Sequence, residues 1–181
     1  GGGKTSAALG QADQLRLSGK IDQIIVVCPT VALKRQWADD AAQFGIQLDP
    51  KWNGTIIKQG FQGIVVTYGT VSTSSRPLFW LCDRKKTFVI FDEIHHAGEQ
   101  KTWGISIKQT FIEATRRLCL SGTPFRSDND EIPFVKYENH ESVADFKYSY
   151  GDAIDDGHCR NIFFPALDGS FSWWDGKKGE K

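Results

Sequence analysis

Apolar residues follow two patterns that alternate along the chain. Continuous apolar runs predict buried strands of a parallel sheet at residues 24–28, 64–68, 87–91 and 118–120. Between these runs, apolar residues recur every three or four positions and predict helices over residues 4–18, 31–44, 77–83 and 103–113. This alternation is typical of an α/β domain with a mostly parallel sheet and helices on both faces. Beyond residue 124 the pattern weakens: residues 132–137 predict one more strand, and residues 142–156 a polar helix or a loop.

Length and composition narrow the classes of protein. The 181 residues are enough for one α/β domain with a sizeable core, but not for two. The formal net charge is zero, which argues against a broad basic surface that coats nucleic acid but leaves room for a local groove. No apolar run is long enough to cross a membrane. The four cysteines are widely scattered without a CxxC pair, which favours reduced thiols in an intracellular, cytoplasmic protein.

The first five residues are Gly1, Gly2, Gly3, Lys4 and Thr5, and they lead directly into the first predicted helix. Gly-Lys-Thr before a helix is the end of a phosphate-binding loop, whose backbone N–H groups point at phosphate oxygens. The Lys4 charge would lie near the outer phosphates, and the Thr5 hydroxyl can bind Mg²⁺. The tripeptide alone is a weak signal. Because the chain has no methionine and begins inside this motif, we expect it to be a fragment.

Two acids follow the apolar run at residues 87–91. Asp92 can bind Mg²⁺, and Glu93 can position and activate the attacking water. The two acids could simply mark an exposed strand end. That interpretation is disfavoured, because an apolar run that ends in two acids followed by His95 and His96 is unusual for an ordinary strand end. A zinc site at these histidines is disfavoured, because no other Cys or His lies at ligand spacing. Together with the Gly-Lys-Thr segment, the acids predict a site for a nucleoside triphosphate.

Each cluster of candidate functional residues directly follows a predicted strand. The clusters are Pro29 with Thr30, Thr67 with Tyr68, Asp92 with Glu93, and Ser121 with Gly122 and Thr123. In open α/β sheets, ligands bind outside the carboxyl ends of the strands. We therefore expect all four clusters to line one edge of the sheet.

On these residues the chain resembles the first RecA-like domain of a superfamily 2 helicase or translocase, a P-loop NTPase fold. The matching motifs are Gly3-Lys4-Thr5 (motif I), residues 28–33 with Gln36-Trp37 (motif Ia), residues 66–70, Asp92-Glu93-Ile94-His95 (motif II in its DExH form) and residues 120–126 (motif III). The Ser-Gly-Thr-Pro-Phe-Arg form of motif III and a Tyr-Ser-Tyr-Gly-Asp connector are similar to the restriction-enzyme and DNA-repair branch.

The resemblance implies an ATP-hydrolysing enzyme that uses ATP and Mg²⁺ to move along nucleic acid, with double-stranded DNA as the expected partner and no membrane. It implies that residues 1–150 are the ATP-binding domain and residues 151–181 a connector towards a second RecA-like domain. That second domain carries the family's arginine finger, so we expect little activity from residues 1–181 alone.

The resemblance also assigns roles to residues. The site residues that it implies are Gly1, Gly2, Gly3, Lys4 and Thr5 for ATP, Thr5 and Asp92 for Mg²⁺, and Asp92, Glu93 and His95 for catalysis. The coupling residues are Ser121, Gly122 and Thr123, joined by His95, and the nucleic-acid contacts are Pro29, Thr30, Thr67 and Tyr68.

Two alternatives to a helicase stay open. The chain could belong to a motor that translocates on duplex DNA without separating strands, as in restriction or remodelling complexes. It could also be a degenerate nucleotide-binding module that only docks partners, although intact Lys4, Asp92 and Glu93 count against this. Without the resemblance, Thr30, Thr67 and Tyr68 could equally be ordinary strand-end residues, and Trp37 is best interpreted as a core residue.

Overall fold

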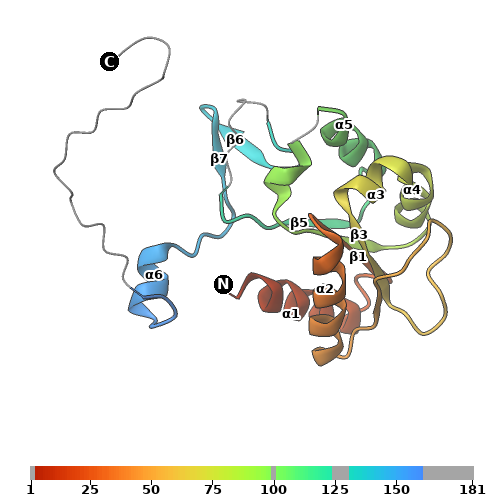
Figure 1. Ribbon diagram of the computed structural model, residues 1–181, viewed down its shortest axis with the longest axis horizontal. Coiled ribbons are helices and arrows are strands. Elements are labelled where there is room, and N and C mark those ends of the chain that lie inside the picture. The colour runs from red at the N-terminus through yellow and green to blue at the C-terminus, as the bar shows by residue number, and fades with distance from the viewer. Residues whose placement is uncertain (1–2, 99–100, 124–130, 161–181) are drawn as a thin grey trace, which may run out of the picture. The chain divides into compact units, whose positions relative to one another are not determined.

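A computed structural model describes residues 3–98, 101–123 and 131–160 of the chain (Figure 1). In chain order, its elements are α1 (Lys4–Leu17), β1 (Gln23–Cys28), α2 (Val31–Gln43), β2 (Leu48–Asp49), β3 (Gly63–Thr67), α3 (Tyr68–Thr73), α4 (Ser75–Arg84), β4 (Thr87–Phe91), the 3₁₀ helix η1 (Ile94–Gly98), α5 (Lys101–Thr110), β5 (Arg116–Cys119), β6 (Lys136–Glu138), β7 (Glu141–Val143) and α6 (Tyr150–Asp155).

The core of the fold is a five-stranded sheet in the order β2-β3-β1-β4-β5, in which every pair of neighbours is parallel. The predicted fold class is confirmed: this is an α/β domain of the RecA-like P-loop type. All carboxyl ends of the strands lie at one edge. The register pairs Cys28 with Thr67, so β1 and β3 end level with each other.

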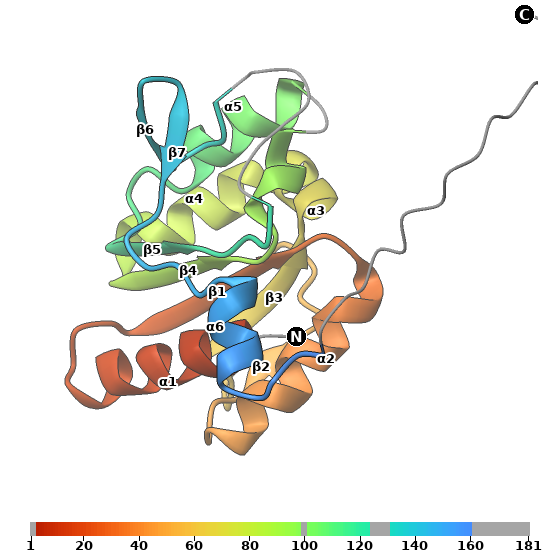
Figure 2. The ribbon, with the colours of Figure 1, turned by 90° about the vertical axis from the view of Figure 1, so that its left-hand side faces the viewer.

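Helices cover both faces of the sheet (Figure 2). Successive residues of a strand point to opposite faces, and β1 feeds two separate cores accordingly. Ile24 and Val26 pack in the core beneath α1 and α2, whereas Ile25 and Val27 pack in the core beneath α3, α4 and α5. Burial on both faces explains why β1, β3 and β4 have the uninterrupted apolar sequences expected of central parallel strands.

Gly63 allows β1 and β3 to approach each other at this register. A Cβ atom at Gly63 would lie 2.1 Å from the carbonyl oxygen of Ile24, far inside van der Waals contact. The glycine is therefore a requirement of the strand pairing that aligns the ends of β1 and β3.

Several local predictions need correction. Tyr68 was expected to continue its strand but begins helix α3, because the Thr67 side chain caps that helix. Of the strand expected at 132–137, only Lys136 and Tyr137 are in a strand, β6, which pairs with β7 as an antiparallel hairpin. Within residues 142–156 only Tyr150–Asp155 are helical, and a capping box formed by Ser149 and Asp152 defines the start of that helix. The short elements β2, α3, η1 and β7 were not predicted.

The chain divides into two compact units, with the boundary after Phe146. The sheet, its helices and the β6–β7 hairpin belong to the first unit, and α6 belongs to the second. The roles expected for residues 1–150 and 151–181 stay predictions. None of the described helices has the length and apolar character needed to cross a membrane. All four cysteines are free thiols, and burial raises the pKa of both Cys28 and Cys82 to about 12.

Candidate active site at the carboxyl edge of the sheet

The N-terminus of α1 offers backbone donors to an anion. Gly3 is the N-cap residue, and its φ of 71° is a left-handed conformation that glycine adopts without strain. No side chain caps this end, and the first turn contains no acidic residue. The first N–H groups of a 14-residue helix and the partly buried Lys4 and Thr5 therefore fit a phosphate. Gly1 and Gly2 lie outside the described residues.

The two acids follow β4 directly, and the backbone around them is anchored on both sides. The Asp92 N–H donates to the Val27 carbonyl at 2.8 Å, and the Ile94 N–H donates to the Leu120 carbonyl at 2.9 Å. Between these anchors, Glu93 has a φ of 49°, in the left-handed region that non-glycine residues rarely adopt. Backbone strain of this kind is concentrated at functional sites.

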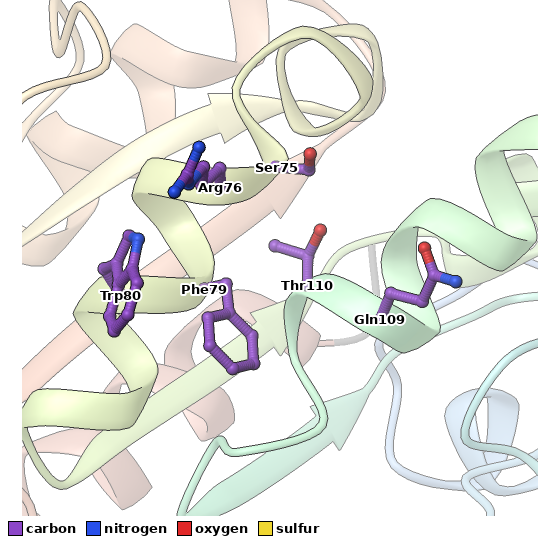
Figure 3. Close-up of a pocket in the computed structure, with 6 residues that line it drawn as sticks. All are labelled: Ser75, Arg76, Phe79, Trp80, Gln109 and Thr110. Carbon is purple, nitrogen blue, oxygen red and sulfur yellow. The ribbon is translucent and has the colours of Figure 1, made fainter.

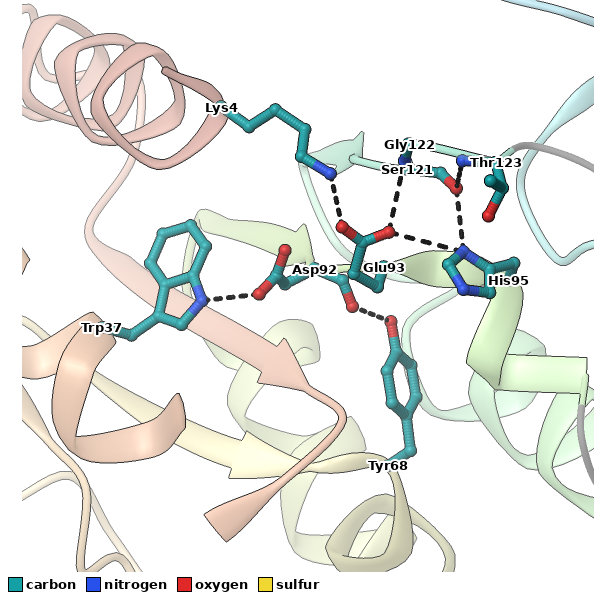
Figure 4. Close-up of polar contacts among 9 residues, drawn as sticks. All are labelled: Lys4, Trp37, Tyr68, Asp92, Glu93, His95, Ser121, Gly122 and Thr123. Atoms are coloured by element: carbon teal, nitrogen blue, oxygen red, sulfur yellow. Dashed lines mark hydrogen bonds and ion pairs between the residues drawn. The ribbon is translucent and has the colours of Figure 1, made fainter. Parts of the chain in front are cut away.

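Glu93 receives contacts from three segments of the chain (Figure 4). Lys4 forms an ion pair with Oε1, the Gly122 N–H donates to Oε2 at 3.2 Å, and His95 Nδ1 lies 3.5 Å from Oε2. Partial burial disfavours the charged form of Glu93, but the hydrogen bonds from Lys4 and Gly122 and the charges of Lys4 and His95 outweigh it. The pKa of Glu93 is therefore lowered, and the carboxylate is ionised at neutral pH.

A short polar network links η1 to the segment after β5. His95 Nδ1 lies 2.9 Å from Ser121 Oγ, and the Thr123 N–H donates to the same oxygen at 3.1 Å. Because His95 also lies beside Glu93, the network connects the carboxylate to residues 121–123. The sequence predicted that these residues lie at one edge, and the structure brings them into contact.

Asp92 is held differently, by two buried aromatic residues. The Trp37 indole N–H donates to Oδ2 at 2.9 Å, and the Tyr68 hydroxyl donates to the Asp92 backbone carbonyl at 2.9 Å. Trp37 is 2% exposed and was expected in the core, but its bond to Asp92 was not foreseen. No local pattern reveals it, because donor and acceptor are 55 residues apart in the sequence.

The residues expected to contact nucleic acid divide into two groups. Thr30 and Thr67 are the N-caps of α2 and α3, where their hydroxyls accept from the Leu33 and Thr70 N–H groups at 3.4 Å and 3.2 Å. Thr30 is exposed, and Pro29 and Thr67 are partly exposed. Tyr68 differs, since its side chain is 1% exposed and is bonded to Asp92. The ring is thus packed in the core, and the contact with nucleic acid expected for Tyr68 stays a prediction.

The donor set suits Mg²⁺ with a nucleotide better than a metal bound by protein ligands alone. Within the described ranges, no group of three or more His, Cys, Asp or Glu side chains could hold a metal ion. Mg²⁺ usually takes one or two carboxylates and completes its coordination with water and substrate phosphates. The Asp92 carboxylate and the Thr5 hydroxyl are oxygen donors that could serve such an ion, and the uncapped N-terminus of α1 could receive the phosphates.

A separate hollow lies away from this site, between α4 and α5 (Figure 3). It has a volume of about 320 Å³ and is lined by Ser75, Arg76, Phe79, Trp80, Gln109 and Thr110. None of the residues predicted for the nucleotide site lines it. The residues predicted for the site thus lie at the carboxyl edge of the sheet and not at this hollow.

Comparison with known proteins agrees with this geometry. The family described as "Type III restriction enzyme, res subunit" (ResIII) matches residues 1–126, about two thirds of the chain. The chain belongs to the ResIII family. This is a family of helicase-like, ATP-dependent nucleic-acid enzymes with a P-loop, and its members generally bind ATP with Mg²⁺. The ResIII match includes Lys4, Asp92, Glu93 and residues 121–123.

Curated relatives resemble nearly the whole ResIII chain. An uncharacterised protein of Mycobacterium tuberculosis is 43% identical over 182 residues, which cover 97% of this chain and 30% of the relative. An uncharacterised protein of Mycobacterium leprae is 41% identical over 180 residues, which cover 96% of this chain and 30% of the relative. The chain thus spans about 30% of the length of these relatives.

Proposed function

We propose that the chain is the ATP-binding half of a superfamily 2 motor of the DExH type, which hydrolyses ATP to move along nucleic acid. One observation carries the proposal. Lys4 at the N-terminus of α1 and Glu93 after β4 are 89 residues apart in the sequence, yet they form an ion pair. This contact supports the assignment of both residues, one as the phosphate-binding lysine and the other as the general base, to a single site.

ATP would be held by the glycine-rich residues 1–3, by Lys4 and by Thr5, with the phosphates at the N-terminus of α1. Asp92 and the Thr5 hydroxyl would hold Mg²⁺, which supplies charge neutralisation on the phosphate oxygens. The open helix end, without a capping side chain or an acid, supports this arrangement.

Glu93 would orient the attacking water and accept its proton. Its pKa lies below the ordinary value for a glutamate, so the side chain is ionised and has a lone pair free to accept a proton. Phosphate oxygens would compete with Glu93 for Lys4, so binding of ATP would release Glu93 from the ion pair. The base would then become available when substrate is present.

Nucleic acid would bind beside the nucleotide, at the N-termini of α2 and α3. Backbone N–H groups at helix N-termini bind phosphate, and contacts of this kind follow a strand without reading its sequence. Thr30 and Thr67 mark these two ends, and the register of β1 and β3 brings them to the same edge. His95, Ser121, Gly122 and Thr123 would transmit the state of the γ-phosphate, and the hydrogen bond between His95 and Ser121 supports this route.

The substitution Lys4→Ala in the full-length protein tests the nucleotide site. Hydrogen bonds to charged groups are worth about 1.5–3 kcal/mol, so we expect ATP affinity with Mg²⁺ to fall by at least about 10-fold in isothermal titration. Lys20→Ala removes an exposed lysine just beyond the other end of α1 and should leave the affinity unchanged. Equal affinity of both variants and the wild type would contradict the proposal.

The family description favours a second form of this function, a motor that translocates on duplex DNA within a restriction-type complex without strand separation. Both forms need a second RecA-like domain in the full-length chain and an intracellular DNA substrate. Strand displacement and triplex displacement measured on the same preparation distinguish them. Triplex displacement without strand displacement would identify the translocase, and both activities together would identify the helicase.

A further inference from the structure

Asp92 is anchored from both faces of the sheet. Trp37 belongs to the core beneath α1 and α2, and its indole N–H binds Asp92 Oδ2 at 2.9 Å. Tyr68 belongs to the core beneath α3, α4 and α5, and its hydroxyl binds the Asp92 carbonyl at 2.9 Å. The side chain and the main chain of one residue are thus held by separate layers of the domain (Figure 4).

These two bonds can hold Asp92 firmly. A hydrogen bond to an ionised carboxylate is stronger than a neutral one, and Trp37 at 2% exposure is shielded from water that would compete for it. With Oδ2 engaged, the orientation of the carboxylate is set and Oδ1 is the oxygen left for Mg²⁺. Partners that orient a metal ligand in this way typically change metal affinity by about 10- to 100-fold.

The same two aromatic residues lead to the expected strand contacts. Trp37 lies seven residues after the N-cap Thr30, about 10 Å along one rigid helix. Tyr68 is the first residue of α3 and follows the N-cap Thr67 directly. A displacement of either helix end therefore moves a group that is bonded to Asp92.

We propose that Trp37 is a positioning residue for Asp92, and that Trp37 and Tyr68 connect the N-termini of α2 and α3 to the Mg²⁺ site. Contact of a nucleic-acid strand with Thr30 and Thr67 changes the position of Asp92, and with it the affinity for Mg²⁺, through this route. The route does not include His95 or Ser121. The inference rests on the proposed function, because it requires Mg²⁺ with nucleotide at Asp92 and a strand at these helix ends.

The test uses Trp37→Phe in the full-length protein, which keeps an aromatic ring and removes the indole N–H. Binding of Mn²⁺ in the presence of ADP is measured by electron paramagnetic resonance. We expect the Mn²⁺ affinity to fall by about 10-fold, while ADP affinity in EDTA stays unchanged. Trp52→Phe is the matched control, because Trp52 is 5% exposed and its indole nitrogen has no hydrogen-bond partner among the described residues. It should bind Mn²⁺ like the wild type.

The link to nucleic acid is measured by repeating the Mn²⁺ titration with a short DNA duplex. Coupling between sites is reciprocal, so DNA changes the Mn²⁺ affinity of the wild type by the factor by which Mn²⁺ changes DNA affinity. We expect this factor to approach one in Trp37→Phe and to persist in Trp52→Phe. Should Trp37→Phe fail to fold, Tyr68→Phe removes one hydroxyl and should weaken Mn²⁺ binding by about fivefold.

Three results would overturn the inference. They are an unchanged Mn²⁺ affinity in a folded Trp37→Phe variant, an equal loss in Trp52→Phe, and an unchanged coupling factor in Trp37→Phe. If the wild type itself showed no metal-dependent nucleotide binding, the proposed function would fall together with the inference. The first three results leave the proposed function standing, so the two failures are distinguishable.

Discussion

Asp92 and Glu93 are neighbours in the sequence, but their surroundings have little in common. Asp92 is bonded to a buried indole and a buried phenol, both uncharged donors on helices that pack against the sheet. Glu93 is bonded to a lysine ammonium and a main-chain N–H from partly exposed or exposed segments. The partners of Asp92 are part of the core, whereas those of Glu93 lie on partly exposed or exposed segments. The difference supports the proposal that Asp92 keeps a fixed position while Glu93 exchanges Lys4 for water when ATP binds.

The backbone explains how adjacent residues reach such different places. Asp92 continues the alternation of β4 and points to the face that carries Ile90 and Trp37. Glu93 then leaves the strand with a left-handed φ, which turns its carboxylate towards Lys4 and Gly122. The contrast between the two acids can be tested by changing one side at a time.

The largest effect is expected from Glu93→Gln. The amide keeps the shape of the side chain but cannot accept a proton, so hydrolysis should fall by roughly 10²–10⁴ while ATP binding persists. Single-turnover ATPase and ATP titration of the full-length protein measure the two quantities. Glu113→Gln, at an exposed residue after α5, is the control and should retain both. Loss of binding in parallel with hydrolysis would mean that Glu93 acts as a binding residue.

Asp92→Asn should instead weaken Mg²⁺-dependent nucleotide binding. The amide oxygen can still accept the Trp37 N–H, but the negative charge for Mg²⁺ is lost. Even changes to groups around a metal ligand cost about 10-fold in affinity, so we expect at least that loss in Mg²⁺-dependent nucleotide binding. Binding in EDTA should be unaffected. If Asp92→Asn and Glu93→Gln behaved alike, the contrast between the two acids would be wrong.

The double substitution Ser121→Ala with Thr123→Ala tests whether the polar network beside Glu93 couples ATP hydrolysis to nucleic acid. It removes the hydroxyl that lies beside His95, a bond worth about 1 kcal/mol, so DNA stimulation of ATPase should fall by about fivefold. Translocation should fall further than hydrolysis does. A proportional loss of both would show that the segment is catalytic. No change in either would make residues 121–123 a structural turn.

The smallest effect concerns stability in acid. A carboxylate with a lowered pKa stabilises the fold above its ordinary value of 4.5, and this contribution is lost as the pH falls from 4.5 through the lower folded value. Glu93→Gln should therefore show a shallower fall in melting temperature below pH 4.5 than the wild type. The difference should correspond to about 1 kcal/mol or less, because the ion pair is partly exposed. An equally steep fall would show that the ion pair adds no stability.

The sequence predicted the layout of the sheet better than the contacts within the site. The apolar run predicted both ends of β4 correctly, at Thr87 and Phe91. Burial on both faces of the sheet explains this, because it leaves no exposed polar position within the strand. The two-residue β2 was missed because Leu48–Asp49 is too short to show a period. Helix α3 was missed because Thr67 ends an apolar strand and caps the next helix within one residue.

Within the site, contacts between residues of known motifs could be predicted from the sequence, whereas contacts that depend on tertiary packing could not. Lys4 and Glu93 were expected together because each belongs to a motif whose chemistry requires the other. The bond from Trp37 to Asp92 depends on how α2 packs against β1 and β4, which periodicity cannot specify. The burial of Tyr68 in the core depends on the same packing and was not predicted either.

The left-handed backbone at Glu93 limits which sequences this position can accept in a library or in evolution. A β-branched residue would be excluded there by its backbone, whatever its chemistry, since φ values near 49° crowd its side chain. Glycine would relax the turn and Asn or Asp would tolerate it, but none of them has the side-chain length of glutamate. Selection for turnover should therefore keep glutamate at this position, although its backbone conformation suits other residues better.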